Sequence, residues 1–202
     1  MEEVKSFLRS RQPVNLMIVA VNILVFLALS FVGNLENADF MLQHGACYTP
    51  FVVQRHEYYR LLTSMFLHFG FEHLINNMII LIFLGDTLEL LAGKFRYLLI
   101  YLAGGIAGNI ISTAWDMRTG EYAVSAGASG AVFAVIGALI FLVLRSKGRI
   151  EGMTGRRLIF MAVLSILEGL TSSGVDNIAH IGGLAAGFLL ALLTNAGEKK
   201  IE

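Results

Sequence analysis

Three short polar sets contain the side chains of this chain that could carry out chemistry, and each set opens a long apolar stretch. Ionisable groups are energetically costly inside a membrane helix, so each of them is a candidate functional residue. The sets are His68, His73, Asn76 and Asn77; Ser125-Ala126-Gly127-Ala128-Ser129-Gly130; and Asp176, Asn177, Ala179 and His180. A serine, histidines and side-chain amides can together catalyse acyl transfer if the fold brings them into one place.

Ser129 and His180 are the candidate nucleophile and base. A serine hydroxyl is a weak nucleophile until an adjacent base removes its proton, and histidine is the usual base. Acyl transfer also needs hydrogen-bond donors for the developing oxyanion. His73 and Asn77 are four residues apart, therefore on one face of a helix, and both can donate. The backbone N–H of Ser129, close to the start of a helix, is a further donor.

These motifs are weak when each is taken alone. Small residues at a helix interface explain Gly127-Ala128-Ser129-Gly130 at least as often as catalysis does, and the run differs from the Gly-x-Ser-x-Gly elbow of soluble hydrolases. A single histidine near the end of a membrane helix is more often interfacial than catalytic. The residues alone therefore leave open a serine protease and a proton-coupled transporter or channel.

The composition indicates a polytopic membrane protein. Hydrophobic residues make up 56% of the 202 residues and charged residues 15%, with a mean hydropathy of +0.70, whereas a soluble domain carries about a quarter charged residues. The 15 basic and 15 acidic residues balance, and nucleic-acid modules, Walker loops and CxxC pairs are absent, so we expect no nucleic-acid partner. Cys47 is the single cysteine, which excludes an intrachain disulfide. We expect neither a metal nor a cofactor.

Six apolar stretches predict an all-α bundle of six transmembrane helices, because a membrane-spanning helix needs about 20 apolar residues. The expected spans are 14–32, 72–91, 95–114, 122–144, 157–170 and 178–194. We expect 14–32 to be a retained helix, because it is too long for the apolar core of a signal peptide. The predicted domain thus covers residues 14–194, with a first outer loop at 33–63 and tails at 1–13 and 195–202.

The distribution of basic residues predicts that both tails are cytoplasmic, because loops rich in lysine and arginine stay on that side. Of the 15 lysines and arginines, only Arg55, Arg60 and Arg118 fall in the opposite loops. The spans that begin at 72, 122 and 178 then all run inward, which places the three polar sets at one depth. Ser129 would lie about 10 Å below Tyr122 along a continuous helix.

Small residues on the fourth and sixth spans predict a close approach of these two helices. They are Gly130, Ala134 and Gly137 on the fourth span and Gly183 and Gly187 on the sixth. Such an approach would bring His180 within reach of Ser129. The first outer loop mixes apolar and charged residues, so we expect it to lie in the membrane interface with Tyr58, Tyr59 and Arg60 at headgroup depth.

Taken in this order, the residues resemble the rhomboid family of intramembrane serine proteases. The resemblance rests on Gly127-Ala128-Ser129-Gly130, on Ala179-His180-Ile181-Gly182-Gly183 with Gly187, and on Tyr59-Arg60 through His68, His73 and Asn77. It implies that Ser129 is the nucleophile and His180 the general base and acid, with His73 and Asn77 at the oxyanion-hole positions. Gly127, Gly130 and Gly183 would shape the site, and Glu89 would be structural. Phe133 stands where the family often has a tyrosine that stacks on the catalytic histidine.

The implied reaction is hydrolysis of a peptide bond in or beside the transmembrane helix of another protein. Helical amides are shielded, so the substrate must unwind locally, and helices with glycine, proline or polar residues should be preferred. The resemblance also implies a small residue before the cut and the minimal six-helix bacterial form, hence a bacterial inner membrane. The alternatives are a secondary transporter that uses His73, His180 and Glu168, and a non-catalytic binder of membrane proteins.

Overall fold

The computed structural model describes residues 11–146, 149–150, 153–171 and 175–196. The predicted tails at 1–13 and 195–202 therefore lie almost entirely outside the described residues. The elements are α2 (Pro13–Ser30), α3 (Ala38–Gln43), α4 (Thr49–Gln54), α5 (Arg60–Thr63), η1 (Ser64–Phe66), α6 (Gly70–Ile80), η2 (Leu81–Gly85), α7 (Asp86–Ala92), α8 (Lys94–Thr119), α9 (Ser129–Arg145), β1 (Arg149–Ile150), β2 (Met153–Thr154), α10 (Gly155–Thr171) and α11 (Asn177–Leu193). The predicted all-α class is confirmed, since the described strands are one pair of two-residue segments.

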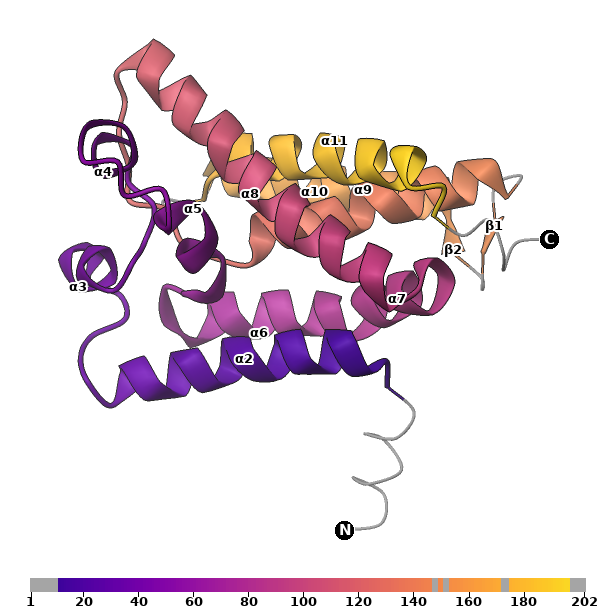
Figure 1. The fold of residues 1–202 in the computed structure, drawn as a ribbon, viewed down its shortest axis with the longest axis horizontal. Coiled ribbons are helices and arrows are strands. Elements are labelled where there is room, and N and C mark those ends of the chain that lie inside the picture. Colours follow the sequence, from indigo (N-terminus) through magenta and orange to yellow (C-terminus); the bar gives the residue numbers. More distant parts are fainter. Residues whose placement is uncertain (1–10, 147–148, 151–152, 172–174, 197–202) are drawn as a thin grey trace, which may run out of the picture.

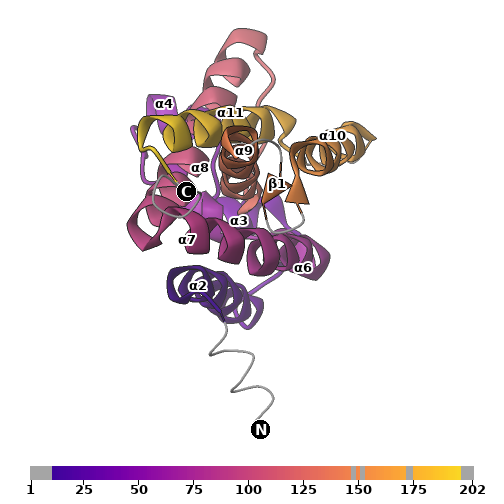
Figure 2. The ribbon, with the colours of Figure 1, turned by 90° about the vertical axis from the view of Figure 1, so that its right-hand side faces the viewer.

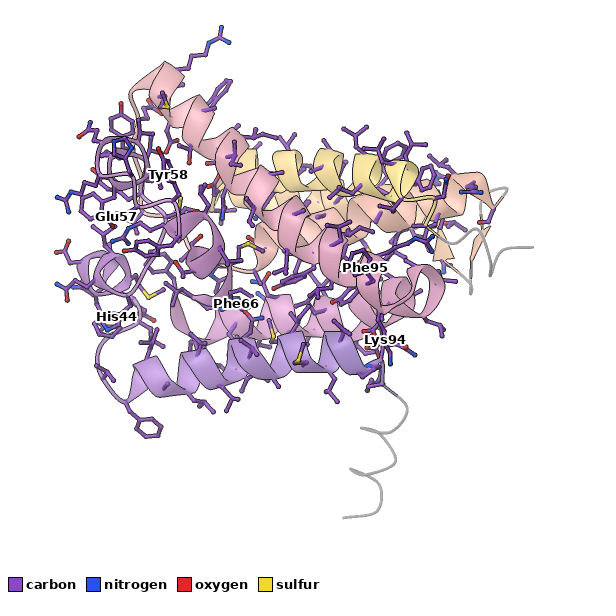
Figure 3. All side chains as sticks on the ribbon, in the orientation of Figure 1. His44, Glu57, Tyr58, Phe66, Lys94 and Phe95 are labelled. Carbon is purple, nitrogen blue, oxygen red and sulfur yellow. The ribbon has the colours of Figure 1, made fainter. Side chains whose placement is uncertain are left out.

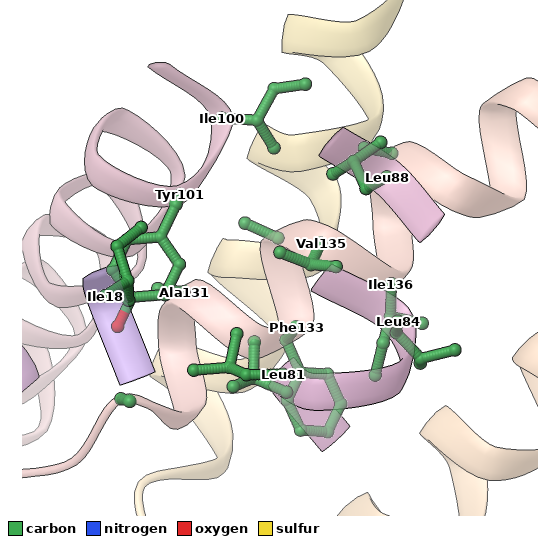
Figure 4. Close-up of a cluster of buried hydrophobic side chains, with 14 of the residues drawn as sticks. Ile18, Leu81, Leu84, Leu88, Ile100, Tyr101, Ala131, Phe133, Val135 and Ile136 are labelled. Atoms are coloured by element: carbon green, nitrogen blue, oxygen red, sulfur yellow. The ribbon is translucent and has the colours of Figure 1, made fainter. Parts of the chain in front are cut away.

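The long helices form a bundle around α9, which lies between α8, α10 and α11 in the view of Figure 2. Nearly every residue of α9 is buried, because its side chains are alanine, valine, isoleucine and leucine all round the helix. Figure 4 shows how α9 contributes Ala131, Phe133, Val135 and Ile136 to the core, against Leu81 and other apolar side chains. The first turn of α2 and the last turn of α11 lie at the same end of the bundle (Figure 1), as an even number of spans requires.

Three helical stretches of the described chain are long and apolar enough to cross a membrane: α2, Gly70–Ala92 and α8. The apolar helices α9 and α11 are shorter, at 17 residues each. Gly70–Ala92 runs through α6, η2 and α7, and η2 is a π-helical turn. Asn15 of α2 donates to the Leu81 carbonyl in this turn at 2.8 Å. Glu89 of α7 accepts the backbone N–H groups of Val14 and Asn15, which have no partner inside α2.

The predicted start of the fourth span is wrong, because residues 121–128 are not helical and α9 begins at Ser129. Ser125 instead pairs with Cys47 of the first loop through two backbone hydrogen bonds of 2.8 and 2.9 Å. Gly127 adopts φ +153° and donates its N–H to the Ser64 carbonyl. The apolar side chains of this segment suggested a helix, but its backbone groups are satisfied by distant segments. Ser129 is thus the first residue of its helix.

The third predicted span is too short, because α8 continues past residue 114 to Thr119. Gly120 ends the helix with φ +76°, a left-handed conformation that glycine adopts without strain. Asp116 in the added turn accepts the hydroxyl of Thr49 at 2.7 Å, so the extension of α8 is tied to α4.

The first loop is folded around Arg60, which is buried rather than placed at headgroup depth as the sequence predicted. Its guanidinium donates to the carbonyls of Leu42 and Ala46 at 2.7 and 2.9 Å and forms an ion pair with Glu57. These partners hold α3 and α5 together. Tyr58 and Tyr59 are exposed, as expected for interfacial side chains. Figure 3 shows Glu57 and Tyr58 at one end of the molecule, with Lys94 and Phe95 at the opposite end.

Candidate active site

Ser129 opens α9 and is half-buried. The first N–H groups of a helix have no intrahelical acceptor, so the backbone around Ser129 can donate to a ligand. The preceding residue, Ala128, is held by His68, which lies between η1 and α6: the Ala128 N–H points to His68 Nε2 at 3.4 Å. Burial lowers the pKa of His68 to about 3, so this ring is neutral near pH 7 and can accept a hydrogen bond. His68 therefore helps to hold the backbone that leads into Ser129.

His180 lies in the first turn of α11 and is only 5% exposed. Its imidazole stacks on the ring of Phe133, with centroids 4.3 Å apart and planes at 7°. Phe133 is four residues after Ser129, so both side chains lie on the same face of α9. The stack therefore places the imidazole on the face of the helix that carries the serine.

The described residues contain no hydrogen bond between Ser129 and His180, and His180 Nδ1 has no partner among them. Hydrogen bonds between catalytic groups are often long in enzymes without substrate and shorten in the complex. Ser129 and His180 belong to α9 and α11, two neighbouring helices whose backbones are in direct contact.

Backbone contact between α9 and α11 is the close approach that the small residues predicted. A Cβ atom at Gly183 would collide with the carbonyl oxygen of Gly130, the residue that follows Ser129. A Cβ atom at Gly187 would collide with the carbonyl of Ala134, and one at Gly137 with that of Leu184. Only glycine at these positions lets the helices pack at this distance.

His73 lies against Gly127, next to the serine. A Cβ atom at Gly127 would lie 2.8 Å from His73 Nε2 and 3.5 Å from Ser129 Oγ, so these groups surround one point. Asn77 is buried one turn further along α6, and its amide donates to the His73 carbonyl at 2.8 Å. An amide nitrogen carries two hydrogens, so this bond leaves a second donor. The structure thus brings together Ser129, His180 and His73, with Asn77 below them.

Further supports of the site were not singled out from the sequence. Asn109 of α8 donates to the Leu61 carbonyl at 2.8 Å and to the Ser64 hydroxyl at 3.1 Å, and the Ser64 carbonyl accepts the N–H of Gly127. Ser112 of α8 donates to Asp176 at 2.7 Å. Asn109 and Ser112 are polar residues inside a predicted apolar span, and this position was the sequence feature that could have identified them. Within the described ranges, no three His, Cys, Asp or Glu side chains gather as metal ligands would.

The fold and this site define a polytopic α-helical protein in which a serine opens one apolar helix and a histidine of the adjacent helix stacks on Phe133, one turn after that serine. The family model described as "Rhomboid domain" matches residues 55–196. The chain therefore belongs to the rhomboid family, and its apolar helices make it a multi-pass membrane protein. The match begins in the first loop and includes both helices of the site.

Several relatives carry the same family name. The chain is 34% identical to the rhomboid protease GluP of Bacillus subtilis (strain 168) over 189 aligned residues. This alignment covers 94% of this chain and 36% of GluP. It is 36% identical over 137 residues to the putative rhomboid protease YdcA of the same organism, an alignment that covers 68% of this chain and 67% of YdcA. It is 36% identical over 153 residues to RHOMBOID-like protein 1 of Arabidopsis thaliana, an alignment that covers 74% of this chain and 38% of that protein. The chain thus spans little more than a third of the length of GluP and of RHOMBOID-like protein 1.

Proposed function

We propose that the chain is an intramembrane serine endopeptidase that hydrolyses a peptide bond in or next to the transmembrane helix of membrane-protein substrates. The observation that carries this proposal is the stack of His180 on Phe133, one turn below Ser129, across helices in backbone contact. A histidine held this way can serve as a base for one particular serine. The names of the bacterial relatives support the same activity.

In the proposed mechanism the hydroxyl proton of Ser129 moves to the His180 ring as Oγ attacks the substrate carbonyl carbon. The C=O electrons move to the oxygen, and the imidazolium then gives the proton to the departing amine as the C–N bond breaks. The resulting acyl-serine is hydrolysed by water, with His180 again as base. Water must reach Ser129 from the side on which α9 and α11 begin.

We assign the stabilisation of the oxyanion to His73, Asn77 and the Ser129 N–H. His73 Nε2 and Ser129 Oγ border the same space beside Gly127, which supports the assignment of His73. Gly127, Gly130, Phe133 and Gly183 would shape this space. A side chain at Gly127 would enter it and one at Gly183 would separate the helices, whereas a Cβ atom at Gly130 would make only ordinary contacts with Ala179 and Gly105. Donors placed before the reaction need no reorganisation when the charge forms.

The proposed substrates are transmembrane proteins whose helices contain glycine, proline or polar residues near the scissile bond. A peptide bond must leave its helix before Ser129 can attack it, and such residues lower the free energy needed for local unwinding. We also propose a cell-membrane location with both chain ends in the cytoplasm. The excess of lysine and arginine in the loops on that side supports this orientation.

The test combines labelling by a serine-reactive fluorophosphonate with cleavage of a transmembrane reporter in liposomes. We expect the natural chain to be labelled and to cleave, whereas Ser129→Ala and His180→Ala lose cleavage and stay folded. The double variant should be no worse than either single one, because the two groups act as a unit. Ser30→Ala, at the exposed end of α2, is the matched control and should behave like the natural chain.

Two other outcomes would replace the proposal. Uptake of a solute that depends on a proton gradient, without a serine adduct, would indicate a transporter. Capture of membrane proteins that survives Ser129→Ala, without any cleavage product, would indicate a non-catalytic binder. Cleavage by Ser129→Ala would exclude the proposed mechanism outright.

A further inference from the structure

Asp176 precedes α11 and accepts hydrogen bonds from three separate parts of the chain. Its Oδ1 atom accepts the backbone N–H of Ala179 at 2.8 Å, which caps the helix. Its Oδ2 atom accepts the hydroxyl of Ser112 on α8 at 2.7 Å and that of Ser125 at 3.0 Å. One carboxylate therefore ties α8, α11 and the segment before α9 together.

The three bonds lie next to the residues of the proposed dyad. Ala179 is the neighbour of His180, and the His180 N–H is itself bonded to the Asp176 carbonyl at 3.1 Å. Ser125 is four residues before Ser129, and its backbone pairs with Cys47 of the first loop. Hydrogen bonds to a charged acceptor are stronger and shorter than neutral ones. Movement of Asp176 would therefore shift the start of α11 relative to the chain that leads into α9.

We propose that Asp176 is the positioning residue of the active site: it fixes His180 relative to Ser129 by holding the start of α11 to Ser112 and Ser125. This inference rests on the proposed function and adds a residue outside the dyad and the oxyanion donors. Asp176 acts through the backbone and does not orient the imidazole directly. Both of its oxygens are occupied by other donors, and His180 Nδ1 has no partner among the described residues. It therefore differs from the aspartate of a Ser-His-Asp triad, which bonds the histidine ring.

The test compares Asp176→Ala with Asp176→Asn. Alanine removes all three bonds. Asparagine keeps them, because its carbonyl oxygen can accept the Ala179 N–H while its amide donates to the two serine hydroxyls. For Asp176→Ala we expect kcat per labelled site to fall roughly 10- to 100-fold, as for a small misplacement of reacting groups, with KM unchanged within about twofold. Asp176→Asn should restore kcat to within a few-fold of the natural chain.

Two further sets of variants complete the test. Asn37 caps α3 by the same kind of bond, which it accepts from the Phe40 N–H in an exposed position. Asn37→Ala is thus the matched control and should leave kcat unchanged. If Asp176→Ala does not fold, Ser112→Ala and Ser125→Ala each remove one of the three bonds and keep the helix cap. Each should lower kcat several-fold, and combination with the other should lower it further.

The inference is overturned if Asp176→Ala or the two serine variants keep the natural kcat, or if Asp176→Asn loses as much activity as Asp176→Ala. The latter result would indicate that the charge matters and the hydrogen bonds do not. Failure of the proposed function gives a different result. In that case the natural chain itself takes up no fluorophosphonate and cleaves no reporter, whatever residue stands at 176.

Discussion

Replacement of Gly183 by alanine should reduce catalysis far more than it reduces stability. The added methyl group collides with the carbonyl oxygen of Gly130, where carbon–oxygen contacts below 3.0 Å are essentially never found. The helices must therefore separate by on the order of 1 Å. Such overpacking costs about 1–3 kcal/mol, and the better helix propensity of alanine offsets about 1 kcal/mol of it. The net loss of stability is thus about 0–2 kcal/mol.

The effect on the reaction is expected to be larger, because the displaced contact lies close in the chain to both residues of the proposed dyad. Gly130 follows Ser129, and Gly183 is three residues after His180 in α11. A misplacement of about 1 Å between reacting groups can lower a rate about 100-fold. We therefore expect kcat of Gly183→Ala to fall by about two orders of magnitude.

The assay is cleavage of a transmembrane reporter in liposomes, with active sites counted by fluorophosphonate and thermal unfolding measured on the same samples. Gly137→Ala makes an equally severe collision, with the Leu184 carbonyl, about 12 Å further along α9 from Ser129. It should lose similar stability but less kcat. Gly155→Ala meets only Val143, at an ordinary 3.6 Å, and should leave both quantities unchanged.

Three results would contradict the role assigned to Gly183. One is a natural kcat per active site in Gly183→Ala, which would mean that the interface does not set the geometry of the dyad. Another is an equal loss of kcat in Gly137→Ala, which would mean that any disturbance of the two helices has the same effect. A fall in activity that matches the fraction of unfolded protein would likewise assign Gly183 to stability alone.

Three other predictions follow from the site and the topology. Phe133→Leu should lower kcat by removing the ring stacked on His180, and Phe133→Tyr should retain it; equal kinetics of the two variants would exclude a role for the stack. His73→Ala and Asn77→Ala should each lower kcat by up to about 100- to 1000-fold with little change in KM, and a variant that keeps full kcat would not be an oxyanion donor. Cysteines at Asn37 and Thr119 should react with an impermeant thiol reagent in intact cells, and labelling only after lysis would reverse the orientation. Cys47 should give little background, because burial raises the pKa of its thiol to about 11 and keeps the thiolate scarce.

The fold class and the main candidates for the site could be predicted from the amino-acid sequence. The long apolar stretches could become only membrane helices, because backbone groups in lipid must bond within their own segment. Serine, histidine and amide side chains are uncommon at the starts of such helices, so each of them could be identified as a candidate site residue. The glycines on the fourth and sixth spans also predicted which two helices would touch, and the collisions at Gly137, Gly183 and Gly187 agree with that prediction.

The way in which the segment before Ser129 is held could not be predicted without the folded structure. Residues 121–128 are apolar enough to resemble the first turns of a helix, but Ser125 bonds to Cys47, Gly127 to Ser64 and Ala128 to His68. Arg60, which the sequence placed at the membrane surface, is instead buried and donates to the carbonyls of Leu42 and Ala46. Asp176 accepts hydrogen bonds from Ser112 of α8 and from Ser125 in the segment before α9. Hydropathy and spacing report on neighbours in the sequence, whereas these bonds join residues far apart in the chain, so they exist only after the helices have packed.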